Sequence, residues 1–281
     1  MKTLVILAGG ASSRMKKSQA SAGLSAAEVA AANVSAKCLI VLQGDKRPVL
    51  DYIIKNAQAA YYSEIILITS PQNDSFKSWY GDNTWNKERL GVTIKFAIQH
   101  IPEGRKKPYG TADALQQAMD QYPELKEKEF VVCNSDNLYS ADALNQLQIT
   151  AARNAFIAYD RSGLDFPEEK IARFALCRLN KRNELIDIIE KPKLEELENY
   201  RDKTGTLRVS MNIFKFNGAD LYWWLVDCPE NPERKEKELP TAIWLMIRNM
   251  FNASMLGIPL KEHVPDLTTK EDIAIFRSQL K

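Results

Sequence analysis

Residues 3–14 constrain most strongly what this chain can fold into and bind. An apolar run, Leu4 to Leu7, passes directly into a loop of small residues, Ala8 to Ser13, which ends at Arg14. A buried strand followed by a loop poor in side chains lets backbone N–H groups converge on an anion, and an arginine adds a bidentate clamp. The segment therefore predicts a phosphate-binding loop. It has neither the Walker spacing nor the dinucleotide glycine fingerprint, which disfavours both of those sites.

The first half of the chain alternates between apolar, β-branched segments and helical patterns. This alternation predicts an α/β protein with a Rossmann-like, mixed and mostly parallel central sheet that carries helices on both faces. Ligands of such sheets bind beyond the carboxyl ends of the strands, where the loop at residues 8–14 would lie. The expected strands are 2–7, 64–69, 92–98, 129–134 and 154–159, and the expected helices are 48–61, 110–121 and 141–151.

After about residue 160 the pattern changes to an antiparallel set followed by helices. No linker rich in Pro, Gly or Ser separates the two halves, so we expect a single domain over residues 1–281. The expected strands are 172–178, 184–190 and 207–216, and the expected helices are 193–202, 218–226, 239–252 and 269–279.

Charge and cysteine content exclude several classes of protein. The net charge is +2, from 38 basic and 36 acidic side chains, so nothing indicates a nucleic-acid partner. Four dispersed cysteines and two histidines favour free buried thiols over a zinc site. Met1 leads straight into a strand and no apolar run reaches membrane-span length, which predicts a cytoplasmic protein without a membrane partner. The oligomeric state stays open, a homo-oligomer included.

Five further motifs follow the phosphate loop in order. They begin at Lys37 (Lys-Cys-Leu-Ile-Val-Leu), Tyr109 (Tyr-Gly-Thr-Ala-Asp-Ala-Leu), Cys133 (Cys-Asn-Ser-Asp-Asn-Leu-Tyr), Glu190 (Glu-Lys-Pro) and Pro265 (Pro-Asp-Leu-Thr-Thr). Together with Leu-Ala-Gly-Gly-x-x-x-Arg they resemble the signature of sugar-phosphate nucleotidyltransferases, from the first strand to residue 269. That family couples a nucleoside triphosphate to a sugar 1-phosphate and releases pyrophosphate.

The resemblance implies a division of the chain and a role for each matching residue. The nucleotide half would lie at about 1–150 and the sugar-phosphate half at about 151–281. Transfer of a phosphoryl-type group requires that the reacting phosphates are aligned and that their negative charge is neutralised, and basic side chains and Mg²⁺ supply that neutralisation. The implied residues are Arg14, Lys37 and Lys191 for catalysis; Ala8, Gly9, Gly10, Gln99, Gly110 and Thr111 for the nucleotide; Glu190, Lys191, Ser210 and Asn212 for the sugar phosphate; and Asp136 and Asp266 for Mg²⁺. Gly110 is expected to leave room for the base.

Departures from the family signature fall in the loops. Ala36 replaces a proline, and 22 residues separate Arg14 from Lys37. Residues 17–36 would be a lid over the phosphate site or a simple insertion, with a short helix from Ala26 to Ala32 capped by Ser25. Ser210 and Asn212 replace an Asn and a Gly, and the motif after Asp266 lacks the family's glycine.

Several alternatives stay open on the sequence alone. The acceptor could be a non-sugar phosphate alcohol such as phosphocholine, which would make the chain a cytidylyltransferase, or the protein could bind nucleotide sugars as a non-catalytic regulator. Asp136 and Asp266 could cap a turn and a helix, and Glu190 and Lys191 could form an exposed pair. Residues 230–238 are interpreted as a solvated loop.

Overall fold

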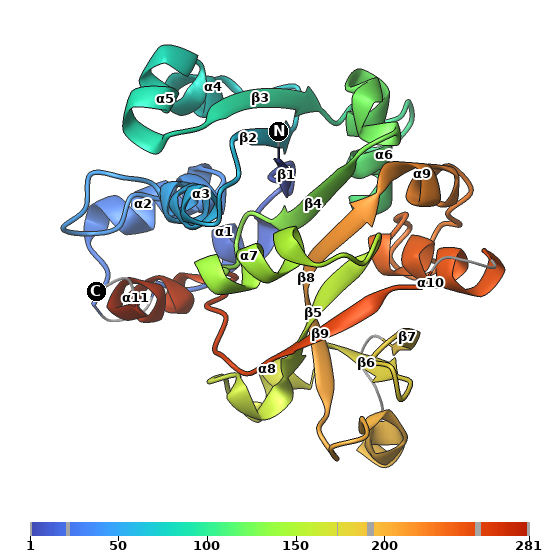
Figure 1. Cartoon of the computed structure of the whole chain (residues 1–281). Coiled ribbons are helices and arrows are strands. Elements are labelled where there is room, and N and C mark those ends of the chain that lie inside the picture. The colour runs from blue at the N-terminus through green and yellow to red at the C-terminus, as the bar shows by residue number, and fades with distance from the viewer. Residues whose placement is uncertain (1, 21–22, 173, 190–193, 251–253, 280–281) are drawn as a thin grey trace.

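One mixed sheet of nine strands runs through the part of the chain that the structure describes (Figure 1). The computed structural model describes residues 2–20, 23–172, 174–189, 194–250 and 254–279. The strands are β1 Thr3–Leu7, β2 Glu64–Thr69, β3 Thr93–Ile98, β4 Glu129–Asn134, β5 Ala155–Asp160, β6 Ala175–Leu179, β7 Leu185–Ile189, β8 Arg208–Asn217 and β9 Leu256–Leu260. Their order is β3-β2-β1-β4-β8-β5-β9, with β6 paired to β8 and β7.

The parallel part of the sheet is formed by β1 to β4. Val5 lies opposite Ile66 on β2 and Val132 on β4, and β3 continues the parallel set beside β2. The antiparallel β8 then separates β4 from β5, and β5 is parallel only to the last strand, β9. The predicted α/β fold with a mixed, mostly parallel core is therefore confirmed.

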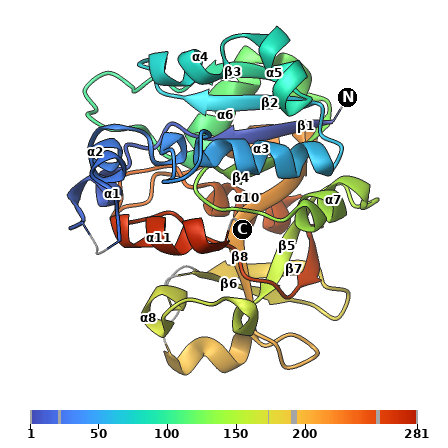
Figure 2. The same cartoon turned by 90° about the vertical axis from the view of Figure 1, so that its left-hand side faces the viewer.

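Helices cover both faces of this sheet, as Figures 1 and 2 show. Successive residues of a strand point to opposite faces, so Leu4 and Ile6 join one buried cluster while Val5 joins the other. The first cluster takes in side chains of α3, α4, α5 and α7, and the second takes in those of α6, α9 and α10. These helices are α3 Val49–Ala59, α4 Asp74–Tyr80, α5 Asn83–Leu90, α6 Thr111–Gln121, α7 Ala141–Ile149, α9 Gly218–Val226 and α10 Leu239–Asn249.

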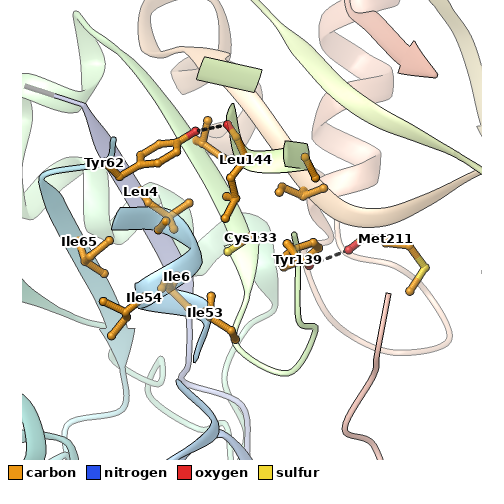
Figure 3. Packing of buried hydrophobic residues seen from close by; sticks show 14 of the residues in the cluster. Leu4, Ile6, Ile53, Ile54, Tyr62, Ile65, Cys133, Tyr139, Leu144 and Met211 are labelled. Atoms are coloured by element: carbon orange, nitrogen blue, oxygen red, sulfur yellow. Dashed lines mark hydrogen bonds between the residues drawn. The ribbon is translucent and has the colours of Figure 1, made fainter. Parts of the chain in front are cut away.

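Two buried tyrosines fix the first cluster in place. The Tyr62 hydroxyl donates to the carbonyl of Leu144 on α7 at 3.1 Å, and the Tyr139 hydroxyl donates to the carbonyl of Met211 on β8 at 2.7 Å (Figure 3). Each bond satisfies a polar atom that would otherwise be costly inside the core. The second bond joins the segment after β4 to β8, the strand that separates β4 from β5.

A third cluster binds the segment after the phosphate loop to the C-terminal helix. It contains Met15, Ala32, Ile273 and Phe276, from α1 Ser13–Lys17, α2 Ala26–Val34 and α11 Lys270–Gln279. Figure 2 shows α11 next to α1 and α2. The predicted short helix is present, because Ser25 and Glu28 form a reciprocal capping box at its start.

Four α-helices and one strand of the described residues are missing from the sequence prediction: α1, α4, α5, α8 (Glu168–Ile171) and β9. Helix α5 is predominantly polar, and β9 reads Leu-Gly-Ile-Pro-Leu, where Gly and Pro suggest a loop. The predicted helix 193–202 is a short 3₁₀ helix, η4 Leu194–Tyr200, in its described part, and α8 precedes β6. Among the described residues, no helix has the length and apolar character needed to cross a membrane.

Candidate active site

A cavity of about 410 Å³ lies at the carboxyl ends of β1 and β4. We call it the first cavity. Its walls are the phosphate loop, the 3₁₀ helix η1 Lys37–Leu39, the residue after β3, the start of α6 and the segment that follows β4. The predicted residues that line it are Ala8, Gly9, Gly10, Arg14, Lys37, Gln99, Gly110, Thr111 and Asp136.

Backbone and side-chain bonds hold the phosphate loop against its neighbours. The Ala8 N–H donates to the Ile68 carbonyl on β2 at 2.8 Å, so the loop begins over the end of that strand. Ser12 adopts a left-handed conformation, φ 53°, and its hydroxyl accepts the Lys37 N–H at 3.2 Å. The loop thereby positions the second motif, although 22 residues separate Arg14 from Lys37.

Lys37 and Asp136 form an ion pair across the first cavity. Their side chains are 18% and 15% exposed, and they come from segments 99 residues apart in the sequence. The neighbouring Cys38 is buried, and burial raises the pKa of its thiol to about 12. Since that thiol stays protonated near neutral pH, Cys38 is a poor nucleophile, and Lys37 and Asp136 are the charged groups on this wall.

The start of α6 meets a loop from the second half of the chain. Gly110 has φ 103°, and a Cβ built on it would lie 2.3 Å from the Lys237 carbonyl oxygen. The Thr111 hydroxyl accepts the Leu239 N–H at 2.9 Å. Glycine is therefore required at position 110 by the backbone of Lys237 and by the positive φ. That it also leaves room for a base stays a prediction.

A second cavity, of about 990 Å³, adjoins the first. The two share Arg14, Asn134 and Asp136 in their linings. The predicted residues Ser210, Asn212 and Asp266 line the second cavity and not the first. The predicted residues therefore line two adjoining cavities, which meet at the exposed Arg14 and at the Asp136 carboxylate.

Ser210 and Asn212 lie in the part of β8 where its pairing with β5 shifts register. Asn212 has φ 56°, and its N–H donates to the Ser210 hydroxyl at 3.2 Å. Asparagine is among the few residues that adopt this conformation readily, which explains how Asn can stand where the family signature has Gly. Asn212 therefore holds a backbone conformation that glycine also adopts readily.

Asp266 lies beside Asp136 because two segments pair. The Leu267 N–H donates to the Asp136 carbonyl at 2.8 Å, and the Leu138 N–H donates to the Pro265 carbonyl at 2.9 Å. The Asp266 carboxylate already accepts the Thr268 hydroxyl at 2.6 Å and pairs with Lys170 Nζ at 3.0 Å.

The donor set fits a hard cation only in part. In the described ranges no group of three or more His, Cys, Asp or Glu side chains could hold a metal ion. Oxygen ligands suit Mg²⁺, which takes one or two carboxylates and fills its shell with substrate oxygens and water. Asp136, at the meeting point of both cavities, pairs with Lys37 and fits this mode if Lys37 turns to a substrate phosphate, whereas the Asp266 carboxylate is engaged by both Thr268 and Lys170.

Glu190 and Lys191 lie outside the described residues, so their predicted place at the sugar phosphate stays a prediction. Of the described residues in the segment 17–36, only Ala36 lines a cavity, the first one. The helix in that segment instead packs into the third cluster.

The sequence analysis did not identify two cavity residues in the loop that ends at Glu238. Glu236 lines the first cavity and Arg234 lines the second, so residues 230–238 border the site and are not a merely solvated loop. The Lys237 N–H donates to the Tyr109 carbonyl at 2.7 Å, which ties the loop to the start of α6. No local pattern indicates this pairing between segments more than a hundred residues apart.

Comparisons with known proteins place the chain in context. A family model described as nucleotidyl transferase matches residues 3–250. The glucose-1-phosphate adenylyltransferase of Geobacillus stearothermophilus is 24% identical over 208 residues, 73% of this chain and 51% of that protein. The chloroplastic/amyloplastic small subunit of glucose-1-phosphate adenylyltransferase from Triticum aestivum is 29% identical over 119 residues, 42% of this chain and 25% of that protein. The chain thus matches about half or less of the length of these relatives.

Proposed function

The chain belongs to the nucleotidyl transferase family, and we propose that it couples a nucleoside triphosphate to a sugar 1-phosphate and releases pyrophosphate. The observation that carries this proposal is the pair of adjoining cavities that share Arg14, Asn134 and Asp136. The triphosphate would occupy the first cavity, against the phosphate loop. The sugar phosphate would occupy the second, so that the two reacting phosphates meet at the shared residues.

The reaction is a displacement at the α-phosphorus. An oxygen of the sugar phosphate forms a bond to that phosphorus, the bond to the oxygen bridging to the β-phosphate breaks, and pyrophosphate leaves with the bonding electron pair. The attacking oxygen is already anionic near neutral pH, so no general base is needed. Arg14 and Lys37 would neutralise the charge that builds up on the leaving pyrophosphate, the contribution that matters most in this class of transfer.

The acceptor side would be completed by groups on the second half of the chain. Lys191 would bind the phosphate of the incoming sugar 1-phosphate, and Glu190 would accept hydrogen bonds from the sugar hydroxyls. Ser210 and Asn212 line the same cavity and would contribute further polar contacts to the sugar.

We also propose Mg²⁺ as the cofactor, held by Asp136 together with substrate oxygens and with Asp266 beside it. When bound, such an ion would reduce the negative charge of the phosphates that converge there. Lys37 now pairs with Asp136, so this lysine is positioned to exchange its carboxylate partner for the phosphates of a bound triphosphate.

A second acceptor class is favoured by the charge of the second cavity. Its described lining holds more carboxylates than cations, whereas the ring of Phe166 is already covered by Lys170 Nζ at 4.4 Å. On charge alone, an acceptor phosphate that carries an ammonium group, such as phosphocholine, would complement this lining better than a sugar phosphate does. The carboxylates are those of Asp136, Asp165, Glu169, Asp266, Glu271 and Asp272, and the cations are those of Arg14, Lys170 and Arg234.

A pyrophosphate-release screen tests the proposal. ATP, GTP, CTP, UTP and dTTP are each combined with glucose 1-phosphate, other sugar 1-phosphates and phosphocholine, with Mg²⁺. The named relatives make ATP with glucose 1-phosphate the first pair to measure. We expect release with at least one pair. Tight binding of a nucleotide sugar without release from any pair would instead support the regulatory alternative.

A further inference from the structure

The side-chain amide of Gln99 has only one orientation that its neighbours allow. Gln99 is 4% exposed at the end of β3, and its Nε2 donates to the Asp113 carboxylate at 2.8 Å and to the Gly110 carbonyl at 3.0 Å. A carboxylate and a carbonyl can only accept, so the atom that faces both must be the nitrogen. Both amide hydrogens are thereby engaged.

The amide oxygen of Gln99 is consequently the group left for a ligand. It faces Gly9 of the phosphate loop, where a Cβ would lie 3.3 Å from Oε1. Gln99 and Gly9 both line the first cavity. A molecule bound in this part of the cavity therefore meets a hydrogen-bond acceptor and no donor from this side chain.

Asp113 is itself held firmly. It is 8% exposed in the first turn of α6, and it accepts a second hydrogen bond from Gln117 Nε2 at 3.0 Å. The Gln117 amide also bonds the backbone of His100, accepting from its N–H at 2.8 Å and donating to its carbonyl at 3.1 Å. One carboxylate thus joins α6 to the two residues that follow β3, and it cannot turn away without breaking these bonds.

We propose that Asp113 is a specificity-determining positioning residue, which makes Gln99 read the nucleobase as an acceptor only. This inference rests on the proposed placement of the nucleotide in the first cavity. A base bound there must offer an N–H, either an exocyclic amino group or a ring imino group. A base without that donor leaves a buried acceptor unpaired, which is penalised strongly in binding.

The first test needs only the unaltered protein. Dissociation constants are measured by calorimetry for ATP, GTP, CTP and UTP, and then for the analogue of the preferred base whose donors are methylated, N6,N6-dimethyl-ATP or N3-methyl-UTP for example. We expect about tenfold weaker binding of the analogue. Equal binding of parent and analogue would overturn the inference.

The second test removes the charge that orients the amide. In Asp113→Asn the residue can donate as well as accept, so only the Gly110 carbonyl still opposes a flip of the Gln99 amide, and the penalty for the methylated analogue should shrink several-fold. Asp113→Glu keeps the acceptor and should keep that penalty. Asp120→Asn, the same change two turns along α6 in an ion pair with Lys126, is the matched control and should leave the penalty unchanged.

The outcomes separate this inference from the proposed function. An equal loss of affinity for the parent triphosphate and its methylated analogue in Asp113→Asn would indicate a purely structural role and would overturn the inference. If triphosphates bind with the expected base dependence but no acceptor releases pyrophosphate, the transfer reaction is wrong and the inference stands. If the protein turns over and its base preference is the same with and without Asp113, the transfer reaction is supported and the inference is overturned. If no triphosphate binds, both are overturned.

Discussion

Two oppositely charged side chains meet where the two cavities join. Lys37 follows the long insertion and Asp136 follows β4, and their pairing keeps each charge compensated at a wall that is largely removed from solvent. Chemistry on phosphates needs both signs at this point, a cation for the phosphate oxygens and a carboxylate for a metal ion. The ion pair therefore preserves both groups close to where they would act.

Removal of either charge should stop the reaction without unfolding the protein. We expect Lys37→Ala and Asp136→Ala to lower kcat by about 100- to 1000-fold, because each removes charge stabilisation of the transition state. The free energy of unfolding should change by only about 1 kcal/mol, since both side chains keep some access to water. Steady-state kinetics and thermal melts measure the two effects. Activity like that of the unaltered protein in either variant would remove that residue from the site.

At the scale of elements, the insertion after the phosphate loop forms a clamp. The buried Glu28 carboxylate caps α2 through Ser25, accepts the Gln43 N–H at 2.9 Å and pairs with Arg277 of α11 at 3.0 Å. Gln43 and Ser25 lie on either side of Lys37 in the sequence, so one carboxylate holds both flanks of the Lys37 segment. The insertion therefore holds the Lys37 segment in position through Glu28.

The Glu28 clamp should make stability depend on pH. Burial opposes ionisation of Glu28, but hydrogen bonds from Gln43 and Ser25 outweigh it, so the pKa lies below its ordinary value of 4.5. A carboxyl with a lowered folded-state pKa stabilises the protein above its unfolded pKa and loses that contribution as the pH falls through the folded value.

Glu28→Gln should destabilise the protein by about 1 to 2 kcal/mol at neutral pH and flatten the loss of stability below pH 4.5. Urea unfolding at several pH values measures both effects. Glu88→Gln, at an exposed position of α5, is the matched control and should leave the profile unchanged. An unaltered pH profile in Glu28→Gln would contradict the clamp.

At the scale of the whole molecule, β8 joins the two halves of the chain. It pairs with β4 from the first half and with β5 and β6 from the second. Strands from both halves thus pack against β8. If either half unfolded, buried side chains of the other half would become exposed to solvent.

We expect the two halves to unfold together. Trp79 and Trp85 report on the first half, and Trp223, Trp224 and Trp244 report on the second. Variants with one of these groups replaced by Phe should show fluorescence transitions at the same urea concentration, which should also coincide with the transition in circular dichroism. Separate midpoints for the two groups would show that the halves unfold independently.

The strands and the loops that carry the predicted site could be read from the sequence because their signals are local. Apolar runs mark β1 to β4, and glycines and charges mark the loops at their carboxyl ends, as in residues 8–14. The missed elements lack such signals. Helix α5 gains little from an apolar face, and β9 tolerates Pro259 because it lies at the edge of the sheet, where an N–H can be dispensed with.

The sequence by itself determined the family, the α/β fold and the order of the motifs, because periodicity and turn residues act over a few positions. Only the tertiary structure decided that Lys37 pairs with Asp136, that Asp113 orients Gln99 and that Gly110 makes room for the backbone of Lys237. The ion pair between Asp266 and Lys170 was likewise decided only by the tertiary structure. Most of these contacts join segments far apart in the chain, and all depend on how strands and helices pack, which no local pattern encodes.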